Sequence, residues 1–196
     1  MNSTIQYQGY TIKAPPGPSD QGDFAASPTD MQVISQVDNT FAVDSGDDVV
    51  LVPGTLTFQC RWVCVLSVMA QQAAETQSVQ MTSGVTTTDS DTKTFSESLG
   101  VSGEVGGGEI PGKVGMALIA SFSQSQTHSV ALSVARTFTQ SYSAQPGTTL
   151  QVWQLHSEYI AEYSHDGQDY RYVLCNEGDP NNSPILELTF PEQAGG

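Results

Sequence analysis

The chain has 196 residues, enough for one domain with a substantial hydrophobic core, and nothing requires a second independent domain. Only 14% of the residues are charged, but 21 Asp and Glu outnumber 6 Lys and Arg, which gives a formal net charge of −15. This charge repels phosphate backbones and anionic lipid headgroups, so nucleic acid is excluded as an expected partner, and contact with a membrane has to begin at a protein or glycan receptor or at an apolar segment.

We expect no secretory signal at the N-terminus and no transmembrane helix. MNSTIQYQGYTIKAPPGP lacks the basic stretch and apolar stretch of a secretory signal peptide, and no run approaches ~18 consecutive apolar residues, so no transmembrane helix is predicted.

Cys60, Cys64 and Cys175 show no metal-type clustering and are expected to be reduced, buried thiols. The histidines lack zinc spacing, and we expect no metal and no cofactor.

In chain order, the pattern is that of an all-β protein. Residues 14–30 are rich in Pro, Gly, Ser and Asp and predict an irregular connection. Pro53-Gly54 and Pro146-Gly147 each precede a β-rich run and predict type II turns, and Asp166-Gly167 predicts a hairpin between YIAEYS and YRYVLC. A last strand is expected at 185–190. Helical periodicity is confined to 69–75, MAQQAAE.

The segment 76–145 is unusual because Ser and Thr alternate with other residues over a great length. From Thr82 to Ser102 every even position is Ser, Thr or Gly, and from 115 to 143 every odd position except Ile119 is small or hydroxylic. The intervening positions carry the bulky side chains. A period of two maintained over this length predicts extended strands well beyond the usual ~5–6 residues.

Within this segment, residues 98–123 form two amphipathic arms around a tip rich in glycine. Eight residues, GGGEIPGK, separate Val105 from Val114, so pairing of the arms as a hairpin places their apolar positions on one side. That side, which suits lipid, comprises Phe95, Leu99, Val101, Val105, Ile110, Val114, Met116, Leu118, Ala120 and Phe122. The other side, which suits water, carries Ser98, Ser102, Glu104, Ser121 and Ser123.

Two interpretations of this hairpin are open. An amphipathic hairpin is usually part of a half-buried sheet packed on a core. A transmembrane β-barrel needs the same alternation over ~9–11 residues, and it requires several chains because a lone hairpin leaves backbone groups unpaired in lipid. About 70 residues of small, uncharged side chains favour the barrel, because they can line a water-filled lumen without carrying many charges into the membrane.

These features resemble the aerolysin-type β-pore-forming toxins, in particular the branch of clostridial epsilon-toxin and the bacillary mosquitocidal toxins. The resemblance is carried by TSGVTTTDSDTKTFSES (82–98), the hairpin 98–123, SQTHSVALSVARTFTQSYS (125–143) and the Pro-Gly-Thr turn into TTLQVWQL (148–155). It covers about 80 residues.

The resemblance implies an elongated, non-enzymatic, all-β protein that acts as a secreted, insecticidal-type toxin. It would bind a target cell through an unknown protein or glycan receptor, form a homo-oligomeric ring, with or without a second toxin component, and insert residues 96–124 as a transmembrane β-barrel. Residues 1–75 would hold a receptor-binding part, 76–156 the pore-forming region and 157–196 the strands that complete the body. Because the family often sheds a terminal peptide, Lys13 is the expected site of a trypsin-like cut. Apart from the resemblance, two roles are open for His128: it becomes charged near pH 6 and tunes assembly, or, as we expect more, it is a passive polar residue of a strand.

Two non-lytic alternatives stay open. One is a lectin-like binding module whose hairpin is permanently packed, and the other is a structural adhesion protein with hydroxyl-rich strands. Release of a dye from target cells distinguishes them from a toxin, because a binding module binds without leakage.

Overall fold

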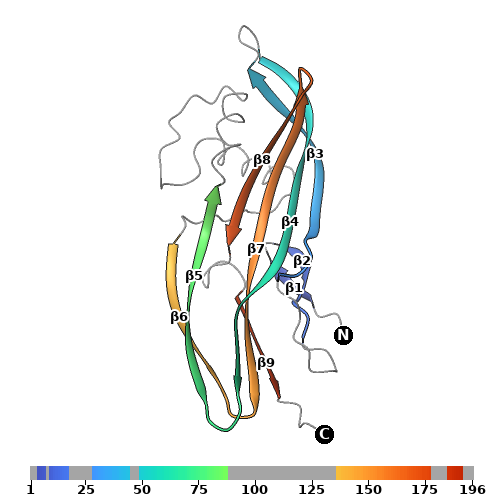
Figure 1. Ribbon diagram of the computed structural model, residues 1–196. Coiled ribbons are helices and arrows are strands. Elements are labelled where there is room, and N and C mark those ends of the chain that lie inside the picture. Colours follow the sequence, from blue (N-terminus) through green and yellow to red (C-terminus); the bar gives the residue numbers. More distant parts are fainter. Residues whose placement is uncertain are drawn as a thin grey trace.

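Long antiparallel strands form the whole regular structure of the described residues. The computed structural model describes residues 4–7, 9–17, 28–44, 49–87, 136–177 and 185–191. Figure 1 shows its strands, which are β1 (Thr4–Tyr7), β2 (Tyr10–Lys13), β3 (Gln32–Asp44), β4 (Val49–Ala70), β5 (Glu75–Thr87), β6 (Arg136–Ala144), β7 (Thr148–His165), β8 (Gln168–Glu177) and β9 (Ile185–Pro191). β4 has 22 residues and β7 has 18. The prediction of an all-β chain with unusually long strands is confirmed.

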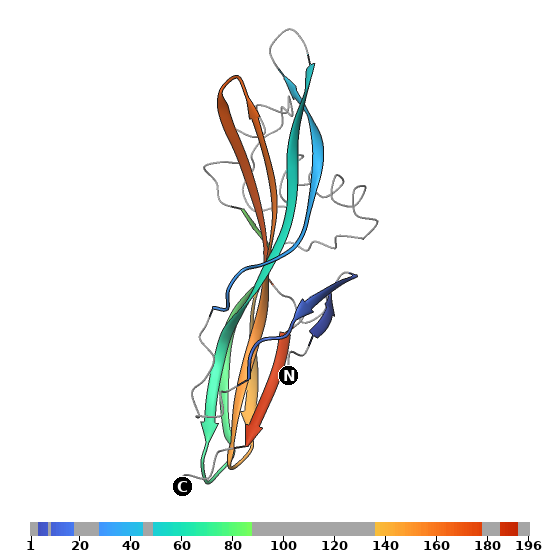
Figure 2. The ribbon, with the colours of Figure 1, turned by 90° about the vertical axis from the view of Figure 1, so that its right-hand side faces the viewer.

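One twisted sheet of seven strands forms the body of the molecule. The strand order is β3-β4-β7-β8-β5-β6, β9 pairs with β7, and β1 and β2 form a separate two-stranded sheet. Every pairing is antiparallel, and Figures 1 and 2 show that the strands run along the long axis of an elongated molecule. β7 is the central strand, because it pairs with β4 on one side and with β9 and then β8 on the other.

The predicted regions contribute strands to the same sheet. β4 comes from region 1–75, β8 from region 157–196, and β7 crosses the boundary between 156 and 157. Their pairing places all three regions in one hydrogen-bonded body. The functional division into 1–75, 76–156 and 157–196 stays a prediction.

Two hydrophobic clusters stabilise the body. Near the turns at the bottom of Figure 1, β4 and β7 pack on β5 and β6 through Val68, Ala70, Met81, Tyr142, Ala144, Leu150 and Val152. The larger cluster is aromatic and includes Phe58, Trp62, Trp153, Tyr159, Tyr163 and Tyr172. Phe58 stacks on Tyr159 with ring centroids 4.9 Å apart, and Tyr163 stacks on Tyr170 at 4.8 Å. The aromatic side chains therefore fix the twisted upper sheet.

The β1–β2 hairpin covers one end of the aromatic cluster. Tyr7 and Ile12 are buried in the cluster, and the ring of Tyr10 lies 5.1 Å from that of Phe58. The indole Nε1 of Trp62 donates a 2.8 Å hydrogen bond to the carbonyl oxygen of Lys13. This bond joins a fully buried tryptophan to the last residue of β2.

Two of the three predicted turns are confirmed. Gly147 has φ +70° and follows Pro146 in the turn between β6 and β7. Asp166 (φ +49°) and Gly167 (φ +74°) join β7 to β8. Positive φ at both central residues is what a type I′ hairpin turn requires.

The turn predicted at Pro53-Gly54 is wrong. Both residues lie within β4, where Pro53 pairs with Thr40 of β3 and Gly54 pairs with Tyr163 of β7. Glycine is needed there for space, because a Cβ at position 54 would lie 2.2 Å from the carbonyl oxygen of Glu162. The helical pattern at 69–75 also gives no helix: these residues end β4, turn and begin β5.

Candidate functional site

The predicted insertion hairpin lies outside the described residues. All ten residues assigned to its lipid face, from Phe95 to Phe122, and all five assigned to its lumen face, from Ser98 to Ser123, fall between 88 and 135. Their assignment stays a prediction. The structure does describe the two strands, β5 and β6, that lead into this segment and out of it.

β5 and β6 pair so that their hydroxylic side chains face each other. Ser78 lies opposite Ser141 with their Oγ atoms 2.7 Å apart, and Thr76 Oγ1 donates to Ser143 Oγ at 3.2 Å. The register continues to the pairs Gln80–Thr139 and Thr82–Thr137. The alternate positions, which include Met81 opposite Phe138, turn toward the lower cluster. The described parts of the two arms thus share one face rich in Ser and Thr. On the other face Met81, Phe138 and Tyr142 pack in the lower cluster beside Gln77 and Gln140.

β5 changes partner between Ser83 and Gly84. Residues 75–83 pair with β6, whereas Gly84–Thr87 pair with β8. Gly84 has φ +90°, a conformation that glycine adopts readily. Gln154 Nε2 of β7 donates a 2.7 Å hydrogen bond to the carbonyl oxygen of Thr82. This side chain fastens β5 to a strand with which it forms no backbone ladder among the described residues.

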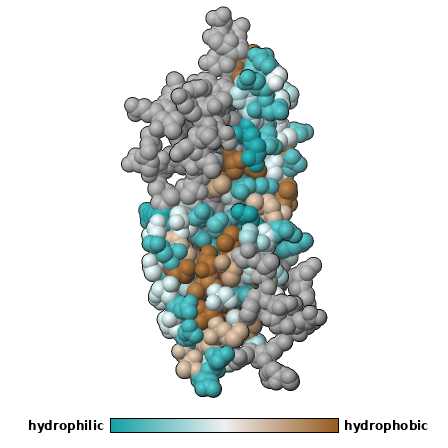
Figure 3. All heavy atoms as spheres, viewed as in Figure 1, coloured by the Kyte–Doolittle hydropathy of each residue, from teal (hydrophilic) through white to brown (hydrophobic). Residues whose placement is uncertain are grey.

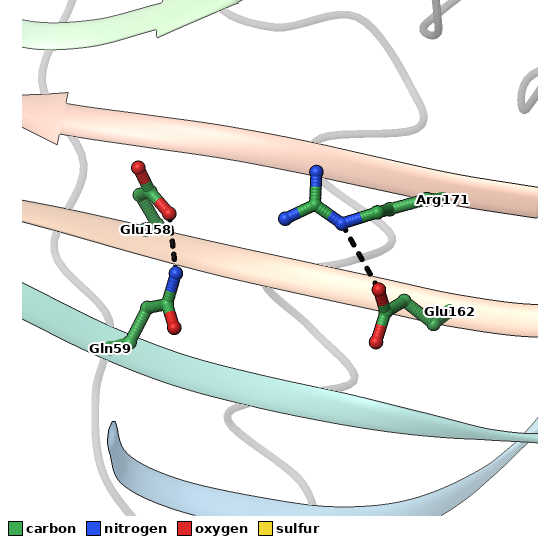
Figure 4. A network of polar contacts seen from close by, with 4 residues as sticks. All are labelled: Gln59, Glu158, Glu162 and Arg171. Atoms are coloured by element: carbon green, nitrogen blue, oxygen red, sulfur yellow. Dashed lines mark hydrogen bonds and ion pairs between the residues drawn. The ribbon is translucent and has the colours of Figure 1, made fainter. Parts of the chain in front are cut away.

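Polar contacts cross the neighbouring strands on one face of the upper sheet. Figure 4 shows Gln59 of β4 donating to Glu158 of β7 at 2.6 Å, and Arg171 of β8 paired with Glu162 of β7 at 3.0 Å. The side chains of Arg171 and Glu162 are 51% and 46% exposed, so water screens their ion pair and its contribution to stability is small.

His156 lies at the end of the β7–β8 ladder, two residues before Glu158 on β7. It is the cross-strand partner of Arg61 on β4 and of Glu177 on β8. Burial lowers the pKa of His156 below its usual 6.5, and the positive charge of Arg61 lowers it further, while the carboxylate of Glu158 raises it. Burial raises the pKa of Glu177 above 4.5. The neutral form of His156 is therefore favoured at this position.

The hydrogen bond between the side chains of His156 and Gln154 could not be predicted from the sequence. Their atoms Nε2 and Oε1 lie 3.4 Å apart. Since the amide nitrogen of Gln154 donates to the Thr82 carbonyl, its oxygen accepts from the imidazole, so the imidazole proton lies on Nε2. Period-two analysis places both residues on one face of β7 but does not identify the contacts they make.

The predicted cleavage residue Lys13 has an exposed side chain and a constrained backbone. Its carbonyl oxygen accepts from Trp62, and its backbone N–H donates to Gln32 Oε1 at 3.2 Å. Proteases cut preferentially where the backbone is exposed and free of such bonds, so these two bonds oppose cleavage. Cleavage at Lys13 stays a prediction.

The thiols and most aromatic residues belong to the interior or its margin. Cys60, Cys64 and Cys175 are free cysteines, Cys60 is buried, and burial raises its pKa to about 12. Cys60 is buried as predicted, whereas Cys64 and Cys175 are only partly buried. Both tryptophans and five of the seven tyrosines are buried, namely Tyr7, Trp62, Tyr142, Trp153, Tyr159, Tyr163 and Tyr172.

On the face shown in Figure 3, hydrophobic residues gather mainly in the lower half and hydrophilic residues dominate the described upper part. Within the described ranges, no group of His, Cys, Asp and Glu is arranged to hold a metal ion. The same ranges contain no helix with the length and apolar character that crossing a membrane requires.

The comparison of structures finds a match, whereas the two comparisons of sequences find none. Neither the protein-family models nor the curated proteins contain a match. Among solved structures, the crystal structure of Cry35Ab1 superposes with a TM-score of 0.52 at 12% sequence identity and covers 93% of this chain. The chain has the aerolysin-like fold of Cry35Ab1. It spans 50% of the length of the Cry35Ab1 chain. At this identity the likeness to Cry35Ab1 establishes the fold alone.

Proposed function

We propose that this chain is a pore-forming toxin and not an enzyme. It binds target cells and assembles into a homo-oligomeric ring. Residues 96–124 of each copy then insert into the membrane as one pair of strands of a transmembrane β-barrel. Its aerolysin-like fold supports this function. Recognition of a protein or glycan receptor, and a possible second toxin component, belong to the same proposal, because a net charge of −15 gives no general attraction to anionic lipid.

The observation that carries the proposal is the register of β5 and β6. Met81 pairs with Phe138 and Glu75 with Ala144. The same register, continued residue by residue into the hairpin, pairs Leu99 with Ala120, Val101 with Leu118 and Val105 with Val114. Every one of these is a pair of residues assigned to the lipid face. The pairing seen outside the hairpin is thus the pairing that an amphipathic membrane hairpin needs.

A ring satisfies the backbone of such a hairpin. Each inserted hairpin has two outer edges whose N–H and C=O groups have no partner in lipid, and each unpaired group costs several kcal/mol. Pairing each edge with the next copy closes the barrel and leaves none unpaired. The hydroxylic face would then line the lumen, where Ser and Thr are in contact with water.

The attachment of β5 to the body also suits release of this segment. β5 pairs with β8 only over Gly84–Thr87, whereas β8 pairs with β7 from His156 to His165. The short ladder separates at lower cost than the long one. We infer that the β5–β8 contact opens when the hairpin leaves its resting position.

Leakage of a dye from loaded target cells tests the proposal with a matched pair of variants. Val101→Asp places a carboxylate on the predicted lipid face, and Ser102→Asp places the same group on the predicted lumen face. A charge on the lipid face costs ~2–4 kcal/mol for Arg or Lys at the bilayer midplane and less for Asp, but the cost is repeated in each subunit of the ring.

We expect Val101→Asp to bind cells and release almost no dye, and Ser102→Asp to retain most of the leakage. Equal leakage from the two variants contradicts the assigned faces. Binding by the wild-type protein without leakage contradicts pore formation and supports a lectin-like binding module.

A further inference from the structure

One residue inside β5 has a backbone conformation that is otherwise found in turns. Four of the five described residues with positive φ lie in turns between strands, namely Gly9, Gly147, Asp166 and Gly167. The fifth, Gly84, lies inside β5 and has φ +90°. A glycine with this conformation in a strand marks a bulge or a bend. Gly84 therefore bends β5 where its pairing with β8 begins, and Figure 1 shows this end of β5 beside the end of β8.

Before this bend, β5 is attached firmly to the body. Met81 and Ser83 are 3% and 2% exposed, and Met81 belongs to the lower cluster. Gln154 of β7, itself buried, donates its 2.7 Å hydrogen bond to the carbonyl oxygen of Thr82. After the bend, the described part of β5 pairs with β8 over four residues, 84–87. The firm attachment therefore ends, and the short ladder begins, at Gly84.

We propose that Gly84 is the hinge at which β5 opens. In the resting protein its positive φ directs residues 84–87 onto β8. A change of Gly84 to the ordinary extended conformation of a strand moves these residues away from β8, while residues 75–83 stay in place through Gln154 and the lower cluster. The use of this motion to free the segment after β5 rests on the proposed function, whereas the motion itself requires no membrane.

A side chain at position 84 shifts the hinge in a defined direction. Glycine adopts positive and negative φ about equally, whereas a Cβ makes positive φ unfavourable and leaves the extended conformation accessible. Asn tolerates positive φ better than Ala, and Val tolerates it least. Opening should therefore increase from the wild type through Gly84→Asn and Gly84→Ala to Gly84→Val. Crowding alone would give another order, because Asn is larger than Ala.

Hydrogen exchange of the intact protein without a membrane tests the hinge. The measured quantity is the ratio of the protection factor of the slowest amide in 75–83 to that of the slowest amide in 84–87. We expect this ratio to exceed one in the wild type and to rise about tenfold in Gly84→Ala. Gly147→Ala is the matched control, because it adds a Cβ at φ +70° with nothing within 4 Å, and it should leave the ratio unchanged.

A second variant tests the attachment that precedes the hinge. Gln154→Met removes the hydrogen bond to Thr82 and keeps a side chain of similar length, so the loss of protection should extend to Thr82 and Ser83. Retained protection of these two amides contradicts the role of Gln154. An unchanged ratio in Gly84→Ala, an equal loss of protection over 75–87, or a larger change in Gly84→Asn than in Gly84→Ala overturns the hinge.

Leakage of dye from target cells tests the use of the hinge and is read separately. Gly84→Ala should release dye severalfold faster than the wild type at equal cell binding, because its resting state is disfavoured. A glycine that serves only the stability of the fold would give slower release when it is replaced. A raised exchange ratio without leakage from either protein supports the hinge and contradicts the pore. Slower leakage from Gly84→Ala contradicts the use of the hinge in release.

Discussion

At the scale of single residues, Gly54 shows how closely the upper strands approach. A Cβ at this position would lie 2.7 Å from the ring of Phe41 and 2.8 Å from Cβ of Tyr163, besides its contact with the Glu162 backbone. The neighbouring atoms belong to paired strands and to a buried aromatic cluster, so they cannot move independently. Position 54 therefore admits only glycine without a shift of the sheet.

We predict that Gly54→Ala lowers the free energy of unfolding by about 3 kcal/mol or more, because it overpacks a rigid site. Gly147→Ala is the matched control: nothing lies within 4 Å of its added Cβ, and only the φ of +70° opposes it, at a cost of about 1–2 kcal/mol. Urea denaturation of both variants measures the difference. Equal losses would contradict the close approach at Gly54.

Lys13 gives a second prediction at this scale. Because Trp62 holds its carbonyl oxygen, trypsin should cut after Lys13 slowly in the native protein. Trp62→Phe removes the donor, worth about 1 kcal/mol, and should accelerate this cut about fivefold. Mass spectrometry of the products over time measures it, and Lys13→Gln identifies the fragment. A cut that is already rapid in the wild type would show that the bond does not protect this site.

At the scale of elements, sequence periodicity predicted what is local and repetitive. The alternation of hydroxylic and bulky residues predicted the strands β5 and β6, and Asp166-Gly167 predicted the β7–β8 turn because two positive φ values suit those residues. Pro53-Gly54 failed because the same dipeptide also serves a strand in which glycine makes room for a neighbour. The partner change at Gly84 depends on which distant strand lies beside β5, and no local pattern records that.

One substitution should allow a disulfide that holds β5 and β8 together. Thr86 is the cross-strand partner of the native Cys175, so Thr86→Cys should form a disulfide that ties β5 to the body. The control pair Ser78→Cys and Ser141→Cys joins β5 to β6, whose pairing is retained in the proposed barrel. We predict that oxidation blocks pore formation in the first variant and leaves it largely intact in the second.

At the scale of the whole molecule, the aerolysin-like fold that the sequence patterns predicted is the fold observed. It was predicted although the sequence identity to Cry35Ab1 is only 12%. The alternation over 76–87 and 136–144 follows from the two faces of β5 and β6, so it is visible without close homology. The candidate site was predicted less fully. The hairpin residues lie outside the described ranges, while the β1–β2 cover and the bond from Gln154 to the Thr82 carbonyl depend on contacts between strands far apart in the chain.

The central claim is that the chain forms a membrane channel by releasing the segment that follows β5. Conductance across a planar bilayer made from target-cell membrane extract tests this most directly, with the wild-type protein and oxidised Thr86→Cys compared before and after a reductant is added. The account predicts stepwise conductance from the wild type, none from the oxidised variant, and its appearance on reduction. Conductance steps from the oxidised variant equal to those of the wild type, or no steps from either protein after reduction, would contradict it.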